Sequence, residues 1–200
     1  MVRKCLVLFV CLILAAVSLA QTKPKSDQIR VLIQTELGDI EIELDAKHAP
    51  STTENFLRYV DAGYYDGGRF HRTVKLKPDN QPNNTVKIEV IQAGLNPGKT
   101  KDNFGPIKLE RTNATGLKHK DGVISMARST ADTATSDFFI CLGDQPELDF
   151  GGKRNADGQG FAAFGKVTKG MDVVKKIHQS PLKDQALTPP IKIIKAKRLN

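Results

Sequence analysis

The stretch Arg30-Val-Leu-Ile-Gln-Thr-Glu36, followed by Leu37-Gly-Asp39 and Ile40-Glu-Ile-Glu-Leu44, decides the class of fold. Apolar and polar residues alternate on both sides of a turn that contains glycine. Because successive side chains of a strand point to opposite faces, the isoleucines and the leucine of the second half share one face and its glutamates share the other. The stretch therefore predicts a half-buried antiparallel hairpin.

Further strands are expected along the rest of the chain, each bounded by turn-forming residues. They are residues 69–74, 86–92, 122–128, 137–142, 161–167 and 191–198. Many short strands separated by turns favour a closed barrel or a sandwich over a parallel sheet. We therefore expect a mainly β fold, a closed eight-stranded antiparallel barrel with an α-helix covering each end.

Two segments have helical periodicity. The first follows Pro50, where Ser51 and Glu54 have the spacing of a capping box, and it ends at Gly63. The second runs from Met171 to His178, with apolar residues three to four positions apart. Two polar stretches rich in Gly, Asn or Pro, residues 75–84 and 151–160, are expected to be inserted loops.

The N-terminus has the three parts of a secretory signal peptide. Met1-Val-Arg-Lys4 is basic, Cys5 to Ala16 is almost entirely apolar, and Ser18-Leu-Ala20 supplies small residues for cleavage before Gln21. An uncleaved anchor is the rival interpretation, but the apolar run is shorter than the ~20 residues that cross a bilayer. We expect a signal peptide over 1–20, a flexible tether over 21–28 and one domain over 29–200. The protein would then be exported, either periplasmic or secreted, with no membrane anchor after cleavage.

The composition excludes several other classes of site. The formal net charge is +8 and is spread along the chain, so we expect a solvated basic surface and no nucleic-acid binding. Cys141 would be the one thiol of the mature chain, buried and inert, with no internal disulfide. His48, His119 and His178 have no metal-ligand spacing and are expected to be solvated or partly packed. We expect neither a metal nor a cofactor.

Five short blocks carry a resemblance. They are Phe70-His-Arg-Thr-Val74, Val90-Ile-Gln-Ala-Gly94, Gly122-Val-Ile-Ser-Met-Ala-Arg128, Ser136-Asp-Phe-Phe-Ile140 and Phe161-Ala-Ala-Phe-Gly-Lys-Val167. In this order they resemble the F-H-R, Q-G-G, S-M-A, S-Q-F-F-I and V-F-G-K-V blocks of the cyclophilin family of peptidyl-prolyl cis/trans isomerases. Each block alone is weak, but five in the right order over residues 29–199 are specific.

The resemblance implies roles for particular residues. Arg72 matches the family's catalytic arginine, and Gln92 matches the glutamine that contacts the substrate carbonyl and steadies that arginine. Phe139 matches the phenylalanine at the floor of the proline pocket. The other expected substrate-binding residues are Met126, Val90, Leu148, Ala127, Arg128 and Phe161. For Met126 and Val90, plain core packing is an equally good interpretation.

The chemistry of the reaction agrees with such a set of residues. Rotation about an Xaa-Pro bond breaks amide resonance and has a barrier of ~18–20 kcal/mol. In the twisted state the prolyl nitrogen becomes a good hydrogen-bond acceptor, so a fixed cation that donates to it stabilises that state selectively. No nucleophile, metal or cofactor is required. We therefore expect a monomeric isomerase acting on proline-containing polypeptides that fold outside the cytoplasm.

Three departures from the family pattern leave a second hypothesis open. Glu89 stands where relatives often have a pocket phenylalanine, Asp137 replaces a glutamine, and Arg128 replaces an asparagine. Asp137 would either brace Arg72 or repel acidic peptides. The alternative function is a proline-peptide-binding chaperone module with weak or no isomerase activity.

Overall fold

The computed structural model describes residues 29–102 and 104–199. In this part of the chain β1 (Ile29–Thr35) and β2 (Gly38–Leu44) form the predicted hairpin. The other strands are β3 (Arg69–Val74), β4 (Val90–Gly94), β5 (Val123–Met126), β6 (Phe138–Cys141), β7 (Ala162–Lys169), β8 (Leu182–Lys183) and β9 (Ala186–Leu199). The expected signal peptide and tether lie outside the described residues.

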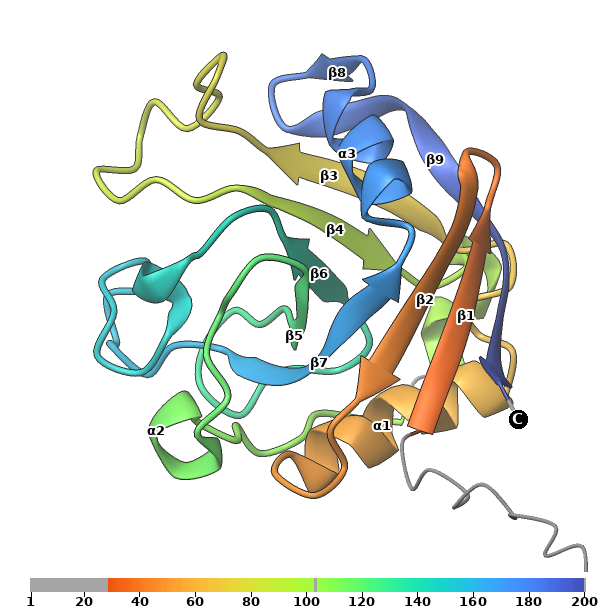
Figure 1. The fold of residues 1–200 in the computed structure, drawn as a ribbon, viewed down its shortest axis with the longest axis horizontal. Helices are drawn as coiled ribbons and strands as arrows, with labels where there is room; N and C mark the ends of the chain where they lie inside the picture. The colour runs from red at the N-terminus through yellow and green to blue at the C-terminus, as the bar shows by residue number, and fades with distance from the viewer. Residues whose placement is uncertain (1–28, 103, 200) are drawn as a thin grey trace, which may run out of the picture.

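The strands close into a barrel (Figure 1). Their order is β1-β2-β7-β5-β6-β4-β3-β9, and β9 returns to pair with β1, so eight strands complete the ring. Every pairing between the described strands is antiparallel. The two-residue strand β8 pairs with β9 alone and stands outside the ring. The predicted closed eight-stranded antiparallel barrel is confirmed.

One strand is shorter than expected at its start. The predicted segment 86–92 becomes strand only from Val90, because the preceding backbone amides bond to side chains instead of a neighbouring strand. The amide of Ile88 donates to Gln81 Oε1 at 3.2 Å, and the amide of Glu89 donates to Gln145 Oε1 at 3.2 Å. The loop between β3 and β4 is therefore longer than the pattern predicted.

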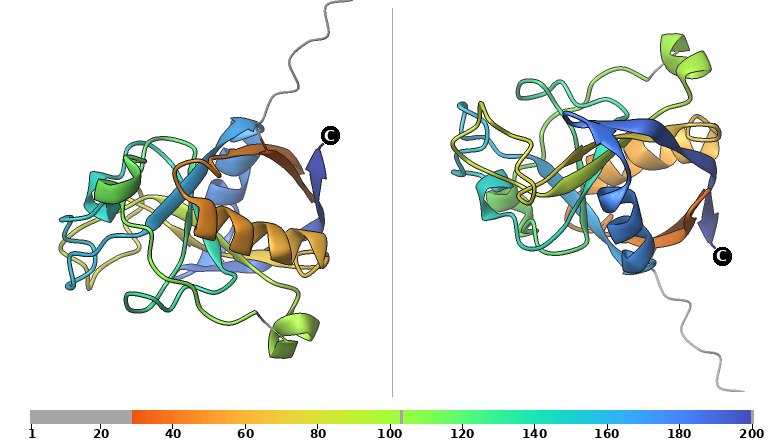
Figure 2. Two further views of the ribbon diagram at one scale, coloured as in Figure 1. Left: turned by 90° about the horizontal axis from the view of Figure 1, so that it is seen from below. Right: turned by 90° about the horizontal axis from the view of Figure 1, so that it is seen from above.

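Two helices lie at opposite ends of the barrel, as Figure 2 shows. They are α1 (Pro50–Asp61) and α3 (Met171–Gln179), and both were predicted. A four-residue helix, α2 (Thr112–Thr115), was not. Two 3-10 turns, η1 (Pro97–Asp102) and η2 (Pro146–Leu148), complete the described elements. None of the described helices has the length and apolar composition needed to span a bilayer.

The predicted capping box of α1 is wrong. The N-cap residue is Ala49, with no side-chain cap, and Pro50 occupies the first turn. The carboxylate of Glu110, distant in sequence, accepts hydrogen bonds from the amides of Ser51 at 3.2 Å and Thr52 at 2.8 Å. A carboxylate at this end also interacts favourably with the helix dipole. The helix start is therefore capped by a tertiary contact that a local pattern cannot reveal.

The barrel wall separates two apolar clusters. Its interior is filled by a large core that includes Phe56 of α1, Phe138 of β6 and Phe164 of β7, all fully buried. A smaller cluster lies on the other face of the same wall, around Phe139 and Val90. Because neighbouring residues of β6 face opposite ways, Phe138 belongs to the core and Phe139 to the outer cluster. The outer cluster forms the base of the candidate site.

The cap of α1 gives a test of the fold. Replacing Glu110 by Ala is expected to lower the free energy of unfolding by about 1 kcal/mol, because two helix amides lose their acceptor. Chemical denaturation of the folded protein measures this change. The matched control is Glu54→Ala, an exposed residue of α1 that would be the partner in a local capping box. An equal or larger loss in the control would contradict the capping by Glu110.

Candidate active site

A cleft of about 560 Å³ opens on the outer face of the barrel wall. Its sides come from β3, β4 and β6 and from the two predicted loops, 75–84 and 151–160, which both extend to the left in Figure 1. Eight of the nine site residues predicted from the sequence line this one cleft. They are Arg72, Gln92, Phe139, Val90, Leu148, Ala127, Arg128 and Phe161.

The guanidinium of Arg72 is held from two sides. Its Nη1 donates to Gln92 Oε1 at 2.9 Å, and this contact follows from the register of β3 on β4, which pairs the two residues. On the other side, Nε and Nη2 both donate to Gln185 Oε1, at 2.9 and 2.6 Å. Burial lowers the pKa of Arg72 below its ordinary value, but a guanidinium remains charged near neutrality. The cleft thus contains a fixed cation.

Gln185 is a site residue that sequence reasoning missed. It lies in the turn between β8 and β9, and its Nε2 donates to the backbone oxygen of Asn80 at 2.9 Å. The side chain of Asn80 in turn donates to the backbone oxygens of Thr73 and Asp184, at 3.0 and 3.1 Å. The loop after β3 therefore supports the turn that braces Arg72. No local pattern marks Gln185, since the contact joins residues far apart in sequence.

Asp137 acts on Arg72 through Gln92. Gln92 Nε2 donates to Asp137 Oδ2 at 3.3 Å, which orients the amide so that its oxygen faces Arg72. The same carboxylate oxygen lies 3.7 Å from His71 Nε2. Burial raises the pKa of Asp137 above its ordinary value, although His71 and the Gln92 hydrogen bond oppose the shift. Gly94 makes room for this carboxylate, because a Cβ there would lie 2.5 Å from Asp137 Oδ1.

The floor of the cleft is apolar. Phe139 and Val90 are almost fully buried and pack with Leu148 in the outer cluster. The ring of Phe161 meets that of Phe139 edge-on, with centroids 5.3 Å apart. Ile88 also lines the floor and was not predicted. This surface suits a compact apolar ring, and the cation and the amide stand at its edge.

Met126 is the predicted residue that the structure places elsewhere. Its side chain is 1% exposed, belongs to the core inside the barrel and does not line the cleft. The register explains this, because Met126 pairs with Phe138, which faces the interior, whereas Ser125 pairs with Phe139. Of the two interpretations left open for Met126, core packing is the one that agrees with its position.

Two of the three residues that depart from the family pattern, Arg128 and Glu89, are held by local contacts. The side chain of Arg128 is almost fully buried and forms a two-pronged ion pair with Asp157, at 2.7 and 2.9 Å. This hydrogen-bonded pairing lowers the pKa of Asp157 to about 2. Glu89 accepts a hydrogen bond from the amide of Leu76 at 3.2 Å and does not line the cleft.

A buried Asp-His-Ser chain lies beneath the cleft. His119 Nδ1 lies 2.8 Å from Asp149 Oδ1, and His119 Nε2 lies 3.0 Å from Ser125 Oγ. The expectation of a solvated or partly packed His119 is wrong, because the residue is 1% exposed and Ser125 is fully buried. A buried hydroxyl is not accessible to a substrate. The imidazole stacks at 16° on Phe139, 6.0 Å between centroids, and so supports the floor.

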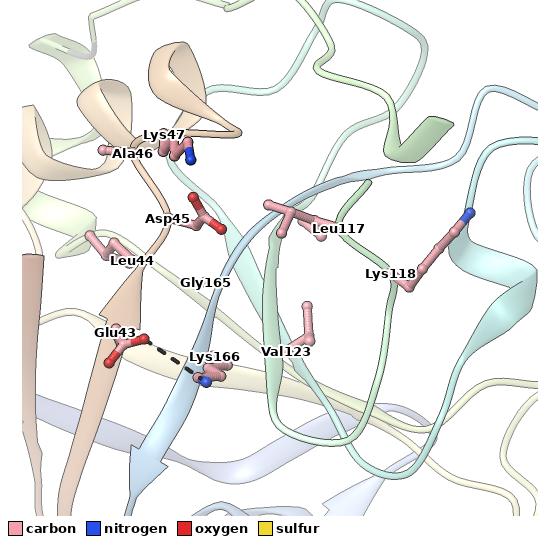
Figure 3. Close-up of a pocket in the computed structure, with 11 residues that line it drawn as sticks. Glu43, Leu44, Asp45, Ala46, Lys47, Leu117, Lys118, Val123, Gly165 and Lys166 are labelled. Atoms are coloured by element: carbon pink, nitrogen blue, oxygen red, sulfur yellow. Dashed lines mark ion pairs between the residues drawn. The ribbon is translucent and has the colours of Figure 1, made fainter. Parts of the chain in front are cut away.

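A second cavity, of about 420 Å³, lies between β2, β7 and the loop before β5 (Figure 3). Leu117 and Val123 line its apolar side, and none of the predicted site residues borders it. Its carboxylates are already paired, Glu43 with Lys166 at 3.9 Å and Asp45 with His48 at 2.8 Å.

The described residues contain no cluster of three or more His, Cys, Asp or Glu side chains that would hold a metal ion. The predicted burial of Cys141 is confirmed, and burial raises its pKa far above the ordinary value.

Comparison with known proteins agrees with this architecture. Residues 30–198 match the family model described as cyclophilin type peptidyl-prolyl cis-trans isomerase/CLD. Peptidyl-prolyl cis-trans isomerase A of Dickeya dadantii is 41% identical over 150 residues, which cover 74% of this chain and 70% of that protein. A peptidyl-prolyl cis-trans isomerase of Acinetobacter baylyi is 38% identical over 170 residues, which cover 82% of each chain.

A solved structure has the same fold. The cyclophilin type peptidyl-prolyl cis-trans isomerase of Cryptosporidium parvum, crystallised in the presence of the dipeptide Ala-Pro, aligns with a TM-score of 0.68 and 24% identity. The alignment covers 86% of this chain and 99% of that one. The family match extends over nearly all of the described residues, and the chain therefore belongs to the family of cyclophilin-type peptidyl-prolyl cis-trans isomerases.

Proposed function

We propose that this isomerase accelerates the rotation of Xaa-Pro bonds with Arg72 as its catalytic residue. One observation carries the proposal: a guanidinium held by three hydrogen bonds stands beside an apolar floor formed by Phe139. The guanidinium has five N–H donors, so two remain for a substrate. Its direction is fixed before the substrate arrives, so little reorganisation is needed during rotation.

The proposed mechanism needs only binding and one directed hydrogen bond. The proline ring rests on Phe139, with Val90, Leu148 and Phe161 around it, while the preceding carbonyl rotates. As the amide twists, its nitrogen gains a lone pair that accepts a hydrogen bond from Arg72. Since the planar amide nitrogen is a poor acceptor, the contact stabilises the twisted state more than either planar isomer. Gln92 orients Arg72 and is the candidate partner for the substrate carbonyl.

The backbone of Ala127 and Arg128 is the remaining part of the proposed substrate site. Both residues border the cleft, and the Arg128 side chain is engaged by Asp157. This pairing supports a contact through the main chain, which depends little on the side chain present. Met126 is not part of the proposal, because its side chain packs inside the barrel.

A binding module without catalysis remains the second candidate. Asp137 is the observation that favours it, because its side chain is 40% exposed and borders the cleft. A carboxylate there attracts the same cation that the reaction needs, although Gln92 stands between them. Measurement of exchange rates separates the two functions, since a binder shifts resonances without speeding the exchange.

We further propose that the protein is exported and acts on proteins that fold outside the cytoplasm, in the periplasm or after secretion. The support is the sequence pattern of residues 1–20, with its basic start, apolar run and small residues before Gln21. In this proposal the mature protein is a monomer without a membrane anchor, and proline-containing segments of polypeptides are its substrates.

The first prediction concerns Arg72. Replacing Arg72 by Ala is expected to lower kcat/KM on an Ala-Pro peptide about a hundredfold or more, because the twisted state loses its donor. Exchange NMR of the peptide measures the rate. Arg69→Ala is the matched control, since Arg69 is an exposed arginine of the same strand and does not border the cleft. Equal activity in the Arg72 variant and the wild type would contradict the mechanism.

The second prediction concerns Gln185 as a positioning residue. Gln185→Ala is expected to lower kcat about tenfold with little change in KM, because Arg72 loses two hydrogen bonds that fix its direction. Gln185→Glu keeps an acceptor oxygen and is expected to retain most of the activity. Lys183→Ala, an exposed change in the same hairpin, controls for disturbance of β8. A purely structural role predicts instead that activity falls in proportion to the folded fraction, with kcat per folded molecule unchanged.

The third prediction concerns export. Expression of the full chain in a bacterium with a secretion pathway is expected to yield a soluble extracytoplasmic protein whose first residue is Gln21. Intact-mass spectrometry of the fractionated protein measures the cleavage site. Replacing Ala20 by a bulky residue such as Phe is expected to block processing and leave the precursor on the membrane. A cytoplasmic protein that retains residues 1–20 would refute the proposal.

A further inference from the structure

A second arginine reaches into the cleft from the loop after η2. Arg154 Nη1 donates to Gln81 Oε1 at 2.9 Å and to the backbone oxygen of Val86 at 2.7 Å. Gln81 is itself fully buried and donates to the backbone oxygens of Lys75 and Ile88, at 3.0 and 2.9 Å. The two loops of the cleft are thereby joined, and Arg154 is held by a buried side chain.

Neither arginine of the cleft has a direct carboxylate partner in the described part of the chain. Arg154 has hydrogen bonds to an amide oxygen and a carbonyl oxygen but no ion pair within residues 29–102 and 104–199, and Arg72 is braced by two amides. Asp157 is paired with Arg128, and Asp137, the carboxylate that borders the cleft, accepts a hydrogen bond from Gln92. Burial first, and the charge of Arg72 second, lower the pKa of Arg154. The two guanidiniums therefore act on one another across the cleft.

Several donors at this end have no acceptor among the described residues. The hydrogen bonds of the Arg154 side chain use Nη1 and leave Nε and Nη2. The neighbouring Asn155 also borders the cleft, but its Nδ2 is buried and is not accessible to a ligand. An anionic ligand group with two oxygens would accept hydrogen bonds from Nε and Nη2 of Arg154.

We propose that Arg154 binds a carboxylate of the substrate, so that the enzyme prefers proline sites flanked by Asp or Glu. Arginine suits this task because its planar fork matches the two oxygens of a carboxylate. The inference rests on the proposed isomerase function and names the substrate class of the same cleft. A lysine beside the proline would instead meet two guanidinium charges and be disfavoured.

The size of the cleft limits where the acidic residue stands. A cavity of about 560 Å³ is on the order of 10 Å across, and consecutive residues of an extended peptide are about 3.5 Å apart. Because Phe139 and Arg154 border the same cavity, the carboxylate belongs to a residue within about three positions of the proline. This gives a short set of peptides to compare.

The test compares peptides that differ only in one charge. Glu, Gln or Lys is placed in turn at each position within three residues of the proline, and exchange NMR measures kcat/KM at low salt. At one position the Glu peptide is expected to exceed the Gln peptide about tenfold, and the Lys peptide to fall below both. Arg154→Gln is expected to bring the ratio of the Glu to the Gln peptide close to one.

Matched variants separate recognition from loop packing. Lys153→Gln removes the adjacent exposed charge and is expected to keep the ratio of kcat/KM on the Glu and Gln peptides. Arg154→Lys keeps a positive charge and is expected to keep part of the preference for Glu. Three results would overturn the proposal. The wild type could show no preference for the Glu peptide, or Arg154→Gln could lower kcat/KM equally on the Glu and Gln peptides. The third is that Lys153→Gln reduces the ratio of Glu to Gln as much as Arg154→Gln does. If no peptide is accelerated, the isomerase function fails instead. Dissociation constants of the same peptides, from chemical-shift titration, then test the carboxylate site by the same ratios.

Discussion

The hydrogen bonds from the Arg72 guanidinium to two glutamine oxygens are the interaction on which the function proposed for this cleft depends. A free arginine side chain on a strand samples many conformers. A hydrogen-bond donor without a fixed direction does not stabilise one particular state of a substrate. Gln92 and Gln185 remove that freedom without adding a carboxylate that would neutralise the cation. The amide partners therefore preserve both the direction and the charge that a twisted prolyl nitrogen requires.

The barrel makes such a site possible because its wall is apolar on both faces. One face closes the core around Phe138, and the other presents Phe139 as a floor that is stacked on the buried His119. A buried chain from Asp149 through His119 to Ser125 fixes the ring from below. Burial alone would raise the pKa of Asp149, but the hydrogen bonds from His119 outweigh it and keep the pKa low. The contribution of this carboxylate to folding is present above its unfolded pKa and is lost as the pH falls through the folded value.

The sequence predicted the strands, helices and motifs that depend on periodicity and local residue patterns. It did not predict the side-chain positions that depend on contacts between residues far apart in the chain. Alternation and turn residues were sufficient for a closed barrel or a sandwich, and the resemblance to the cyclophilin family assigned Phe139 to the cleft. It did not separate Met126 from the cleft, because the direction of that side chain follows from its register opposite Phe138. Gln185 and Arg154 lie in loops without periodicity, so only the folded chain brings them to the cleft.

A crystal structure of the mature protein with a bound Ala-Pro-containing peptide tests the role of Arg72 directly. We expect the proline ring to lie on Phe139 and a guanidinium nitrogen of Arg72 to come within hydrogen-bonding distance of the prolyl nitrogen, about 3 Å. The hydrogen bonds to Gln92 and Gln185 would remain in place. A peptide bound elsewhere, or an Arg72 side chain turned to solvent in the complex, would contradict this role.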